Sequence, residues 1–357
     1  MATASAPTAS DTKSKSNQEA LLEVRGLKTE FFLQQGIVHA VQGVDFTINR
    51  GQTIGVVGES GCGKSVMARS IMAIVPPPGR VVEGQVLFHS SAGRKGGAGG
   101  EVVNMAAIDP MGQKARSIRG AEISMVFQEP MTSLSPVHSI GNQIMEAILL
   151  HQEVSEAQAR SMAIEMLTRV GMPHPERTID RYPHQLSGGM RQRAVIAMAL
   201  SCRPTLLIAD EPTTALDVTT QAQILTLMTE LQQQFGMAIM FITHDLGVIA
   251  QMADYVIVMY LGQVVEMADV DTIFYNPKHP YTQSLLRSIP LLGRKSAQHA
   301  TSRLTAIKGT IPDAYNIPKG CPFHPRCRKA IAGTCNQKEP PFLELENGHK
   351  VRCVLYE

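Results

Sequence analysis

Short runs of apolar and polar residues typical of β-strands extend from Leu22 to Phe46. Two such runs, LLEVRGLKTEFF and VHAVQGVDFTI, are broken by glycines and by the turn-like QQGI, and they predict an antiparallel opening sheet. The mainly apolar run QTIGVVG then predicts a buried strand. It leads directly into ESGCGKSVMARSIMAIV, whose apolar residues have helical spacing up to PPPG.

Helical spacing dominates from about residue 137 to residue 200, in IGNQIMEAILLHQ, SEAQARSMAIEMLTRVG and GMRQRAVIAMALS. The apolar runs TLLIADEP and AIMFITHD follow, and each predicts a buried strand. Strands that alternate with helices predict a mainly parallel sheet with a helical insertion.

Three stretches lack this periodicity. Residues 1–19 are small and polar, which predicts a disordered tail without a secretory signal. The segment HSSAGRKGGAGGEVVN is rich in Gly, Ser and Lys and predicts a surface loop inserted between strands. Beyond NPKHPYTQSLLRSIP the sequence becomes rich in Pro, Gly and Cys, which predicts a small C-terminal extension.

Composition and charge exclude several classes of protein. The 357 residues, of which 44% are hydrophobic and 18% charged, are typical of a soluble globular protein. The net charge is only +2, so we expect no nucleic-acid partner. The longest apolar runs fall short of the roughly 20 residues of a membrane-spanning helix, so we do not expect the chain itself to cross a bilayer.

A phosphate-binding loop is predicted at GESGCGKS, which fits G-x-x-x-x-G-K-[ST] between a predicted strand and a predicted helix. Its glycines allow backbone N–H groups to converge on phosphate oxygens, and the helix dipole favours the same charge. Lys64 would reach the outer phosphates, and the Ser65 hydroxyl would bind Mg²⁺. The alternative is a glycine-rich turn before a helix. The candidate nucleotide-binding residues of the loop are Gly58, Glu59, Ser60, Gly61, Cys62, Gly63, Lys64 and Ser65.

Two acidic residues end the predicted strand in TLLIADEP, at the edge where open α/β sheets bind ligands. Asp210 could hold Mg²⁺ through a water, and Glu211 could activate the water that attacks the terminal phosphate. The alternative, a solvated turn, is weakened by the phosphate loop upstream. A second helix start, LSGGMRQR, offers another anion-binding N-terminus, and on the residues alone a capped helix explains it equally well.

Six motifs occur in a fixed order: GESGCGKS, VFQEP, LSGGM, LLIADEP, TALD and FITHD. In this order the chain resembles the ATP-binding subunits of ABC transporters. The resemblance implies the α/β fold of a P-loop NTPase, an ABC nucleotide-binding domain with a mainly parallel core sheet, an antiparallel β subdomain and a helical subdomain. The implied division is a tail over 1–19, the domain over 20–290 with its helical part at about 130–200, and a Cys-rich C-terminal extension over 291–357.

The resemblance also implies roles for single residues. In this family the signature of one subunit closes over the ATP held by another, so two sites form only in a head-to-tail dimer. Gln128 would sense Mg²⁺ and the transmembrane partner, and His244 would bind the terminal phosphate. Either Phe31 or Phe32 would stack on adenine, with Phe31 preferred. The implied catalytic residues are Glu211, His244 and Gln128; the Mg²⁺ ligands are Ser65, Gln128 and Asp210; the signature is Ser187, Gly188 and Gly189; the D-loop residue is Asp217.

Within this class the chain is similar to importers of peptides, nickel and related substrates, on FQEPMTSLSPV, RYPHQLSGGMRQR, DEPTTALDVTTQAQIL, NPKHPYTQSLL and the Cys-bearing tail. The similarity implies an ATP-hydrolysing subunit on the cytoplasmic face of the inner membrane that energises the import of di- or oligopeptides. Its implied partners are a second ATPase subunit in a heterodimer, two transmembrane permease subunits and an extracytoplasmic substrate-binding protein.

Several alternatives to peptide import stay open. Nickel or glutathione import would use the same motifs. A soluble ABC ATPase of translation or DNA repair is disfavoured, because the sequence has neither tandem cassettes nor a long coiled-coil insertion. A regulatory subunit that binds ATP without hydrolysis is disfavoured by Glu211 and His244.

Four of the six cysteines lie in the C-terminal extension: Cys321, Cys327, Cys335 and Cys353, with five, seven and seventeen residues between them. In a reducing compartment such a cluster predicts metal binding rather than disulfides. The spacing lacks the C-x₂₋₄-C pair of most structural zinc sites and suits either Zn²⁺ or an iron–sulfur cluster. The family resemblance favours a 4Fe–4S cluster, and free or oxidised thiols are the third alternative. Metal binding would stabilise a segment too poor in apolar residues to form its own core.

Overall fold

The computed structural model of the chain describes residues 19–90, 100–129, 133–214, 216–288 and 307–357. The predicted tail lies outside these residues except for Glu19, and so does the glycine-rich part of the inserted loop, 91–99. The expected boundary between residues 290 and 291 also lies outside them.

An eight-stranded sheet forms the centre of the molecule, in the order β11-β12-β10-β9-β3-β8-β7-β6. Its strands are β3 (Thr53–Val57), β6 (Ile123–Val126), β7 (Leu206–Asp210), β8 (Ala238–Ile242), β9 (Tyr255–Tyr260), β10 (Gln263–Asp269), β11 (Phe342–Glu344) and β12 (Lys350–Arg352). The strands from β9 to β6 pair in parallel, whereas β10, β12 and β11 pair antiparallel. Every residue of β3, β7 and β8 is buried, as expected for parallel strands covered on both faces.

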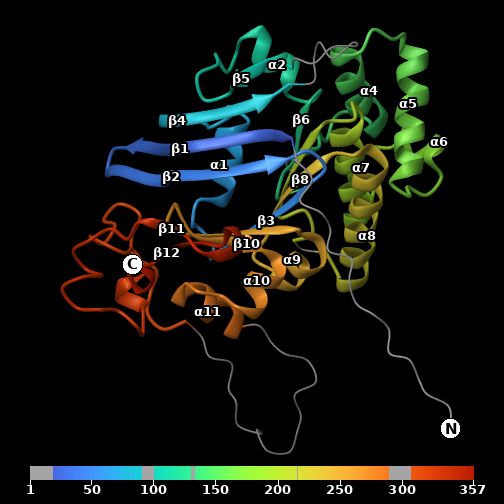
Figure 1. The fold of residues 1–357 in the computed structure, drawn as a ribbon. Helices are drawn as coiled ribbons and strands as arrows, with labels where there is room; N and C mark the ends of the chain where they lie inside the picture. The colour runs from blue at the N-terminus through green and yellow to red at the C-terminus, as the bar shows by residue number, and fades with distance from the viewer. Residues whose placement is uncertain (1–18, 91–99, 130–132, 215, 289–306) are drawn as a thin grey trace, which may run out of the picture.

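A second sheet, antiparallel and in the order β2-β1-β4-β5, packs over one face of the first (Figure 1). Its strands are β1 (Ala20–Leu33), β2 (Gly36–Asn49), β4 (Gly79–His89) and β5 (Val102–Asn104). The alternating runs at the start of the sequence form β1 and β2. Because these strands alternate, they turn one apolar face to a core that includes Leu22 and Val24 and is shared with the main sheet.

Helices cover the remaining surfaces. They are α1 (Lys64–Ile71), α2 (Gln113–Ile118), α4 (Ile140–His151), α5 (Glu156–Arg169), α6 (Pro175–Thr178), α7 (Gly188–Leu200), α8 (Val218–Phe235), α9 (Leu246–Met252), α10 (Val270–Tyr275) and α11 (Pro280–Arg287). Figure 1 shows α4, α5, α6 and α7 gathered at one end of the molecule. Over the part of the chain that the structure describes, no helix has both the length and the apolar character of a membrane span.

The two faces of the main sheet belong to separate cores. On β7, Leu207 and Ala209 join the core on the helical side, whereas Leu206 and Ile208 join the core beneath the antiparallel sheet. Because β3, β7 and β8 are parallel, their carboxyl ends meet at one edge, where the loops that follow them come together.

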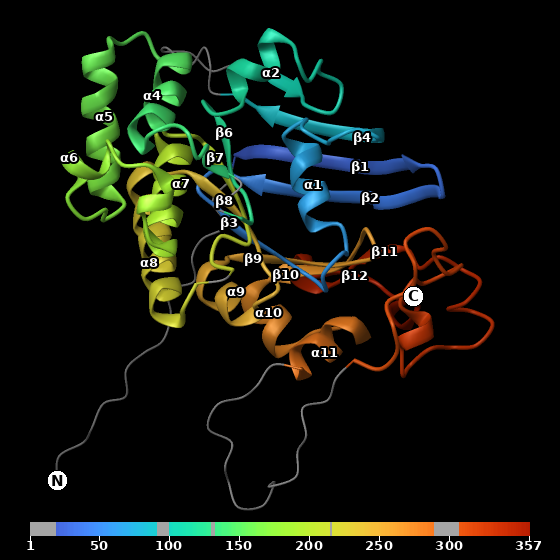
Figure 2. The same cartoon turned by 180° about the vertical axis from the view of Figure 1, so that it is seen from behind.

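The described part of the C-terminal extension is built into the main sheet. Its strand β12 pairs with β10, and β11 pairs with β12. Phe323, which is 1% exposed, belongs to the core on the helical side. Figures 1 and 2 place the extension at the end of the molecule opposite α4, α5 and α6.

Candidate nucleotide-binding site

The loop between β3 and α1 is pressed between neighbouring backbones. Gly63 has a φ of +100°, and a Cβ added there would lie 2.2 Å from the carbonyl oxygen of Ala40. A Cβ at Gly58 would lie 2.3 Å from the carbonyl oxygen of Met259. Neither position can hold a side chain, so the tight turn of this loop requires these glycines. Turns of this kind can present backbone N–H groups to a phosphate.

Lys64 is held over this loop. The residue is only 5% exposed, and its Nζ donates to the carbonyl oxygens of Gly58 at 2.8 Å and Glu59 at 3.1 Å. An ammonium group has three N–H donors. The third contact of Nζ is with Sγ of Cys62 at 3.7 Å, and sulfur is a weak acceptor. Lys64 could therefore turn that donor to a phosphate oxygen and stay anchored to the two carbonyl oxygens.

Two of the oxygen ligands predicted for Mg²⁺ are in contact. Ser65 Oγ, in the first turn of α1, donates to Oδ1 of Asp210 at 3.0 Å. Asp210 ends β7 and is 2% exposed, and this burial raises the pKa of its carboxyl group. Oxygen ligands suit Mg²⁺, whose charge would favour the ionised carboxylate that burial disfavours.

Glu211 is the centre of a second polar group. Gln128 Nε2 donates to Glu211 Oε2 at 3.3 Å, Thr214 Oγ1 donates to the same oxygen at 2.9 Å, and His244 Nδ1 lies 3.3 Å from Oε1. The structure thus brings together the three predicted catalytic residues, which follow β6, β7 and β8. Thr214 is an addition that the sequence did not suggest, since a threonine three residues after a glutamate signals at most a local turn.

The backbone directs Asp210 and Glu211 to different partners. Glu211 has a φ of +48°, a left-handed conformation that costs of order 1–3 kcal/mol in a non-glycine residue. Its N–H donates to the carbonyl oxygen of Ile242 at 2.8 Å. Adjacent carboxylates therefore separate, Asp210 toward Ser65 and Glu211 toward Gln128, which suits one carboxylate for a metal ion and one for a water molecule.

A cavity of about 340 Å³ is lined both by the phosphate loop and by residues of β1 and β2. This volume is in the range of ligand pockets. Phe31 lines the cavity, whereas the ring of Phe32 lies 4.3 Å from the guanidinium carbon of Arg80. Phe31 is therefore the aromatic residue that a base could reach. The lining residues that the sequence did not suggest are Val38, His39, Ala40, Val66, Leu261, Gly262 and Ala314.

The signature lies away from this cavity. Ser187 caps α7 by accepting the N–H of Met190 at 3.4 Å, and Asp217 caps α8 by accepting that of Thr220 at 2.9 Å. A Cβ at Gly189 would lie 2.8 Å from Cγ2 of Thr220, so the two helix starts are closely packed. The exposed residues at these starts include Ser187, Gly188 and Asp217. Ser187 and Gly188 are thus exposed at the start of α7, and neither lines the cavity of its own chain.

The four C-terminal cysteines line one small cavity together with His279 and Phe323. Their thiols are free, and burial raises the pKa of Cys321 to about 11 and also raises those of Cys327 and Cys353. Among the described residues, however, no three His, Cys, Asp or Glu side chains are arranged to hold a metal ion. The predicted 4Fe–4S cluster and its Zn²⁺ alternative therefore find no support in a formed ligand set.

The fold and this constellation are those of an ATPase of the ABC class. A phosphate-type loop, the Ser65–Asp210 contact and the Glu211 carboxylate lie at one sheet edge, and a second glycine-containing helix start is exposed. Comparisons with known proteins agree. The ABC transporter family model matches residues 41–214, and the model of the oligopeptide/dipeptide transporter C-terminal region matches residues 265–335.

Relatives match almost the whole chain. It is 48% identical to the oligopeptide transport ATP-binding protein AppD of Bacillus subtilis, over 94% of this chain and 97% of AppD. It is 45% identical to the dipeptide transport ATP-binding protein DppD of the same organism, over 95% of this chain and 96% of DppD. A dimeric, post-hydrolysis structure of the cassette MJ0796 bound to ADP and phosphate is 25% identical, with a TM-score of 0.60 over 70% of this chain and 99% of that chain.

The chain therefore belongs to the ATP-binding proteins of ABC transporters, in the group that carries the oligopeptide/dipeptide C-terminal region. The predicted family, the predicted fold class and the predicted enzyme class, an ATPase coupled to transport, are confirmed. The predicted function, ATP hydrolysis that energises peptide import, is the function of this family.

Proposed function

We propose that the chain hydrolyses MgATP and thereby energises the import of di- or oligopeptides through separate transmembrane permease subunits. The observation that carries the proposal is the Glu211 carboxylate, held by Gln128 and Thr214 beside the cavity that the phosphate loop lines. Similarity to AppD and DppD supports peptides as the substrate, and nickel or glutathione import is the alternative.

In the proposed reaction a water oxygen forms a bond to the γ-phosphorus, and the bond from that phosphorus to the β,γ-bridging oxygen breaks. Glu211 accepts the proton of the attacking water, and His244 donates a hydrogen bond to the terminal phosphate. Lys64 and the N–H groups of the loop bind the outer phosphates, and Phe31 packs against the adenine. The residues that would hold Mg²⁺, which neutralises phosphate charge when bound, are Ser65, Asp210 and Gln128.

Each ATP would lie between two subunits. The exposed start of α7 supports this arrangement, as does the dimeric state of MJ0796. In a head-to-tail dimer, Ser187 and Gly189 would donate to the terminal phosphate held by the partner subunit, and Asp217 would lie at the interface. We propose that this partner is a second, different ATPase subunit.

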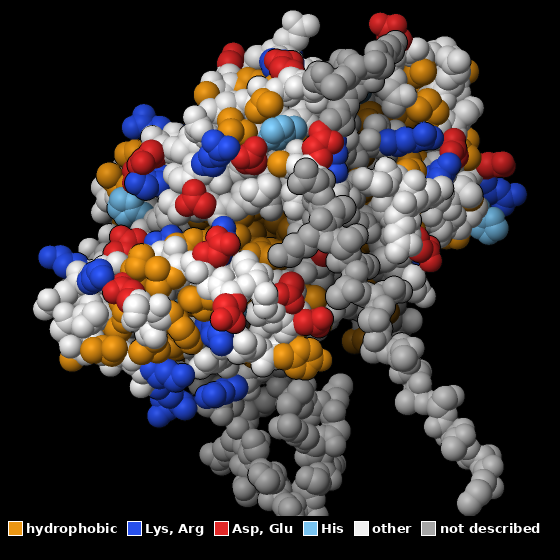
Figure 3. All heavy atoms as spheres, in the orientation of Figure 1, with side chains coloured by type: hydrophobic (Ala, Val, Ile, Leu, Met, Phe, Trp, Pro, Cys, Tyr) orange, Lys and Arg blue, Asp and Glu red, His pale blue; other side chains and the backbone are white. Residues whose placement is uncertain are grey.

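Family membership also supports the remaining partners. We propose that the dimer lies on the cytoplasmic face of the inner membrane against two permease subunits, and that an extracytoplasmic substrate-binding protein delivers the peptide. Lys and Arg side chains are intermingled with Asp and Glu over the described residues on the face drawn in Figure 3, which offers nucleic acid no continuous basic surface there.

We also propose that the extension, residues 291–357, holds a 4Fe–4S cluster through Cys321, Cys327, Cys335 and Cys353. The support for this proposal is that the four cysteines line one cavity and that the oligopeptide/dipeptide C-terminal family model covers three of them, Cys321, Cys327 and Cys335.

The same cavity holds a buried donor. Burial lowers the pKa of His279 to about 4, and its Nδ1 accepts the N–H of Tyr281 at 3.1 Å, so the ring hydrogen is on Nε2. This Nε2 has no partner among the described residues and could donate to a sulfur. Anaerobically purified chain should be brown and contain iron, and a colourless chain loaded with zinc would overturn the assignment.

Substitutions in the phosphate loop and in the signature test the proposed ATPase. In the assembled transporter, Lys64→Ala should abolish ATP binding by this subunit. Ser187→Ala should leave that binding intact and weaken ATP binding by the partner subunit. Photolabelling both subunits with 8-azido-ATP separates the two effects. Loss of labelling only in the subunit that carries Ser187→Ala would contradict the shared sites, and normal labelling of Lys64→Ala would contradict the proposed function.

A further inference from the structure

The C-terminal extension reaches the phosphate loop through an ion pair whose arginine is buried. Arg326 lies between Cys321 and Cys327, and its side chain is 4% exposed. Its Nη1 lies 2.6 Å from Oε2 of Glu59 and its Nη2 lies 3.0 Å from Oε1 of the same carboxylate. Such bidentate pairs fix orientation as well as adding stability. Two residues 267 positions apart are thus joined at the second residue of the loop.

Further contacts fix Arg326 in place. Its Nη1 donates to the hydroxyl of Tyr260 and its Nε to the carbonyl oxygen of Lys308, each at 3.3 Å. The guanidinium carbon lies 5.8 Å from the ring centroid of Tyr260 and 6.0 Å from that of Phe323. These two rings and that of Tyr281 form a cluster with centroids 4.7 to 5.3 Å apart. The guanidinium is therefore enclosed and cannot follow Glu59 if the loop shifts.

The backbone of Glu59 is held from the same direction. Its N–H donates to the hydroxyl of Tyr281 at 2.9 Å, and its carbonyl oxygen accepts from Lys64 Nζ at 3.1 Å. The nucleotide cavity is lined from Ser60 onward and not by Glu59. Glu59 therefore supports the loop from behind, and its carbonyl oxygen helps to anchor the lysine that reaches the phosphates.

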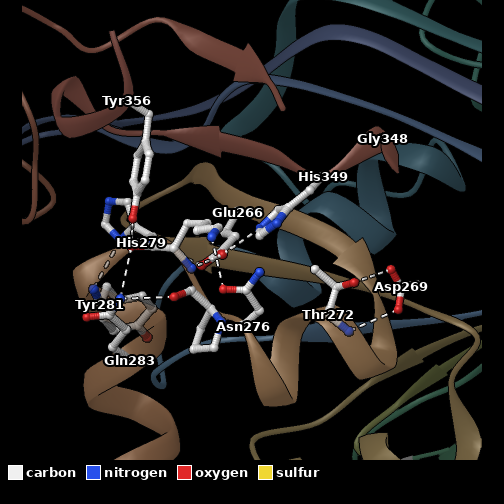
Figure 4. A network of polar contacts seen from close by, with 12 residues as sticks. Glu266, Asp269, Thr272, Asn276, His279, Tyr281, Gln283, Gly348, His349 and Tyr356 are labelled. Atoms are coloured by element: carbon white, nitrogen blue, oxygen red, sulfur yellow. Dashed lines mark hydrogen bonds and ion pairs between the residues drawn. The ribbon is translucent and has the colours of Figure 1, made fainter. Parts of the chain in front are cut away.

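Tyr281 is fixed in turn by a buried polar network (Figure 4). Glu266 on β10 accepts the N–H of His279 at 2.9 Å and lies 2.7 Å from Nε2 of His349 in the extension. The ring of His279 accepts the N–H of Tyr281. Strand β10, the start of α11 and the extension thus form one connected support behind the phosphate loop.

We propose that Arg326 is a positioning residue of the ATP site, through which the Cys-rich extension sets the position of the phosphate loop. The inference rests on the proposed function of that loop. Arg326 acts through Glu59 and does not line the nucleotide cavity. When Arg326 is replaced, the carbonyl oxygen that anchors Lys64 is free to move, and displacements of about 1 Å at a site can cost roughly 10²-fold.

The test uses the full chain, assembled with its transporter partners. Arg326→Met and Glu59→Gln should each raise the ATP concentration for half-maximal turnover about tenfold or more, as outer supports of binding sites do, with a smaller change in kcat. Arg326→Lys should recover part of the loss, because lysine keeps the charge but not the bidentate geometry. The double variant should be no worse than either single variant, because the same interaction is removed.

Arg352→Met is the matched control. Arg352 on β12 also ties the extension to the domain, because its Nε donates to the carbonyl oxygen of Val264 on β10 at 3.2 Å. Its Nη1 lies 3.6 Å from Glu339 within the extension, and neither contact involves the phosphate loop. Arg352→Met should lower the Tm without changing the ATP concentration for half-maximal turnover. If Arg326→Met lowers the Tm by a similar amount but leaves the ATP concentration for half-maximal turnover unchanged, the inference is overturned.

Two further comparisons keep the outcomes separate. If Arg326→Met does not fold, Arg326→Lys and Glu59→Gln carry the test with the same measurement. Normal ATP binding by Lys64→Ala would defeat the proposed function of the loop. Loss of binding in Lys64→Ala together with unchanged half-saturation in the Arg326 and Glu59 variants would defeat only the positioning role.

Discussion

Replacing Glu211 by Gln removes the proposed base and leaves its surroundings nearly unchanged. Glutamine has the shape of glutamate, and its one oxygen can accept from both Thr214 and Gln128, which donate to the same oxygen of Glu211 at 2.9 Å and 3.3 Å. The phosphate loop and the Ser65–Asp210 contact are not altered. We therefore expect Glu211→Gln to bind ATP normally and to hydrolyse it slowly.

The size of the expected loss in hydrolysis rate follows from two effects, the loss of a general base and the loss of a hydrogen bond. A positioned general base contributes about 10²- to 10⁴-fold, which is about 3–5 kcal/mol of barrier. One lost hydrogen bond contributes about 0.5–1.5 kcal/mol. Thr214→Val, which removes only a hydrogen bond to the carboxylate, should thus slow hydrolysis no more than about tenfold.

Single-turnover hydrolysis of labelled ATP, with the subunits in excess, measures this step directly. Glu211→Gln should also accumulate an ATP-bound dimer on size-exclusion chromatography. Hydrolysis by Glu211→Gln at the wild-type rate, or an equal loss in Thr214→Val, would refute the role of Glu211 as the base.

Three other substitutions test the aromatic side of the cavity and the proposed Mg²⁺ site. Phe31→Ala should weaken equilibrium ATP binding at least severalfold, because aromatic stacking on a base is worth about 1–3 kcal/mol; Phe32→Ala, whose ring packs on Arg80, should leave binding unchanged, and equal effects would contradict the assignment. Asp210→Asn should abolish Mg²⁺-dependent hydrolysis yet raise the Tm of the nucleotide-free chain at neutral pH. Burial raises the pKa of the Asp210 carboxyl in the folded chain above its value in the unfolded chain. The free energy of unfolding therefore falls as the pH rises from the unfolded pKa through the folded pKa, and the neutral amide of asparagine avoids that fall. A lowered Tm for Asp210→Asn would contradict this reasoning.

Much of the candidate catalytic site could be predicted to lie together, because its parts are local patterns. Each motif follows a buried strand, and parallel strands bring the residues after them to one edge, so Gln128, Glu211 and His244 meet although 116 positions separate the first from the last. Thr214 and Ala314 could not be predicted, because an unremarkable threonine and an alanine gain a role only from the neighbours that folding gives them.

The C-terminal extension was predictable as a composition change, but its packing was not, because strands of three residues carry no periodic signal. Folding brings it to the ATP site from two directions: Ala314 lines the cavity, and Arg326 holds Glu59 behind the loop. An element attached to a binding loop is coupled to the ligand reciprocally. If Arg326 favours the loop position that binds ATP, bound ATP must favour the docked extension by the same factor. Hydrogen exchange in β12 should therefore slow when ATP binds, and Arg326→Met should abolish that slowing while leaving exchange in β7 unchanged.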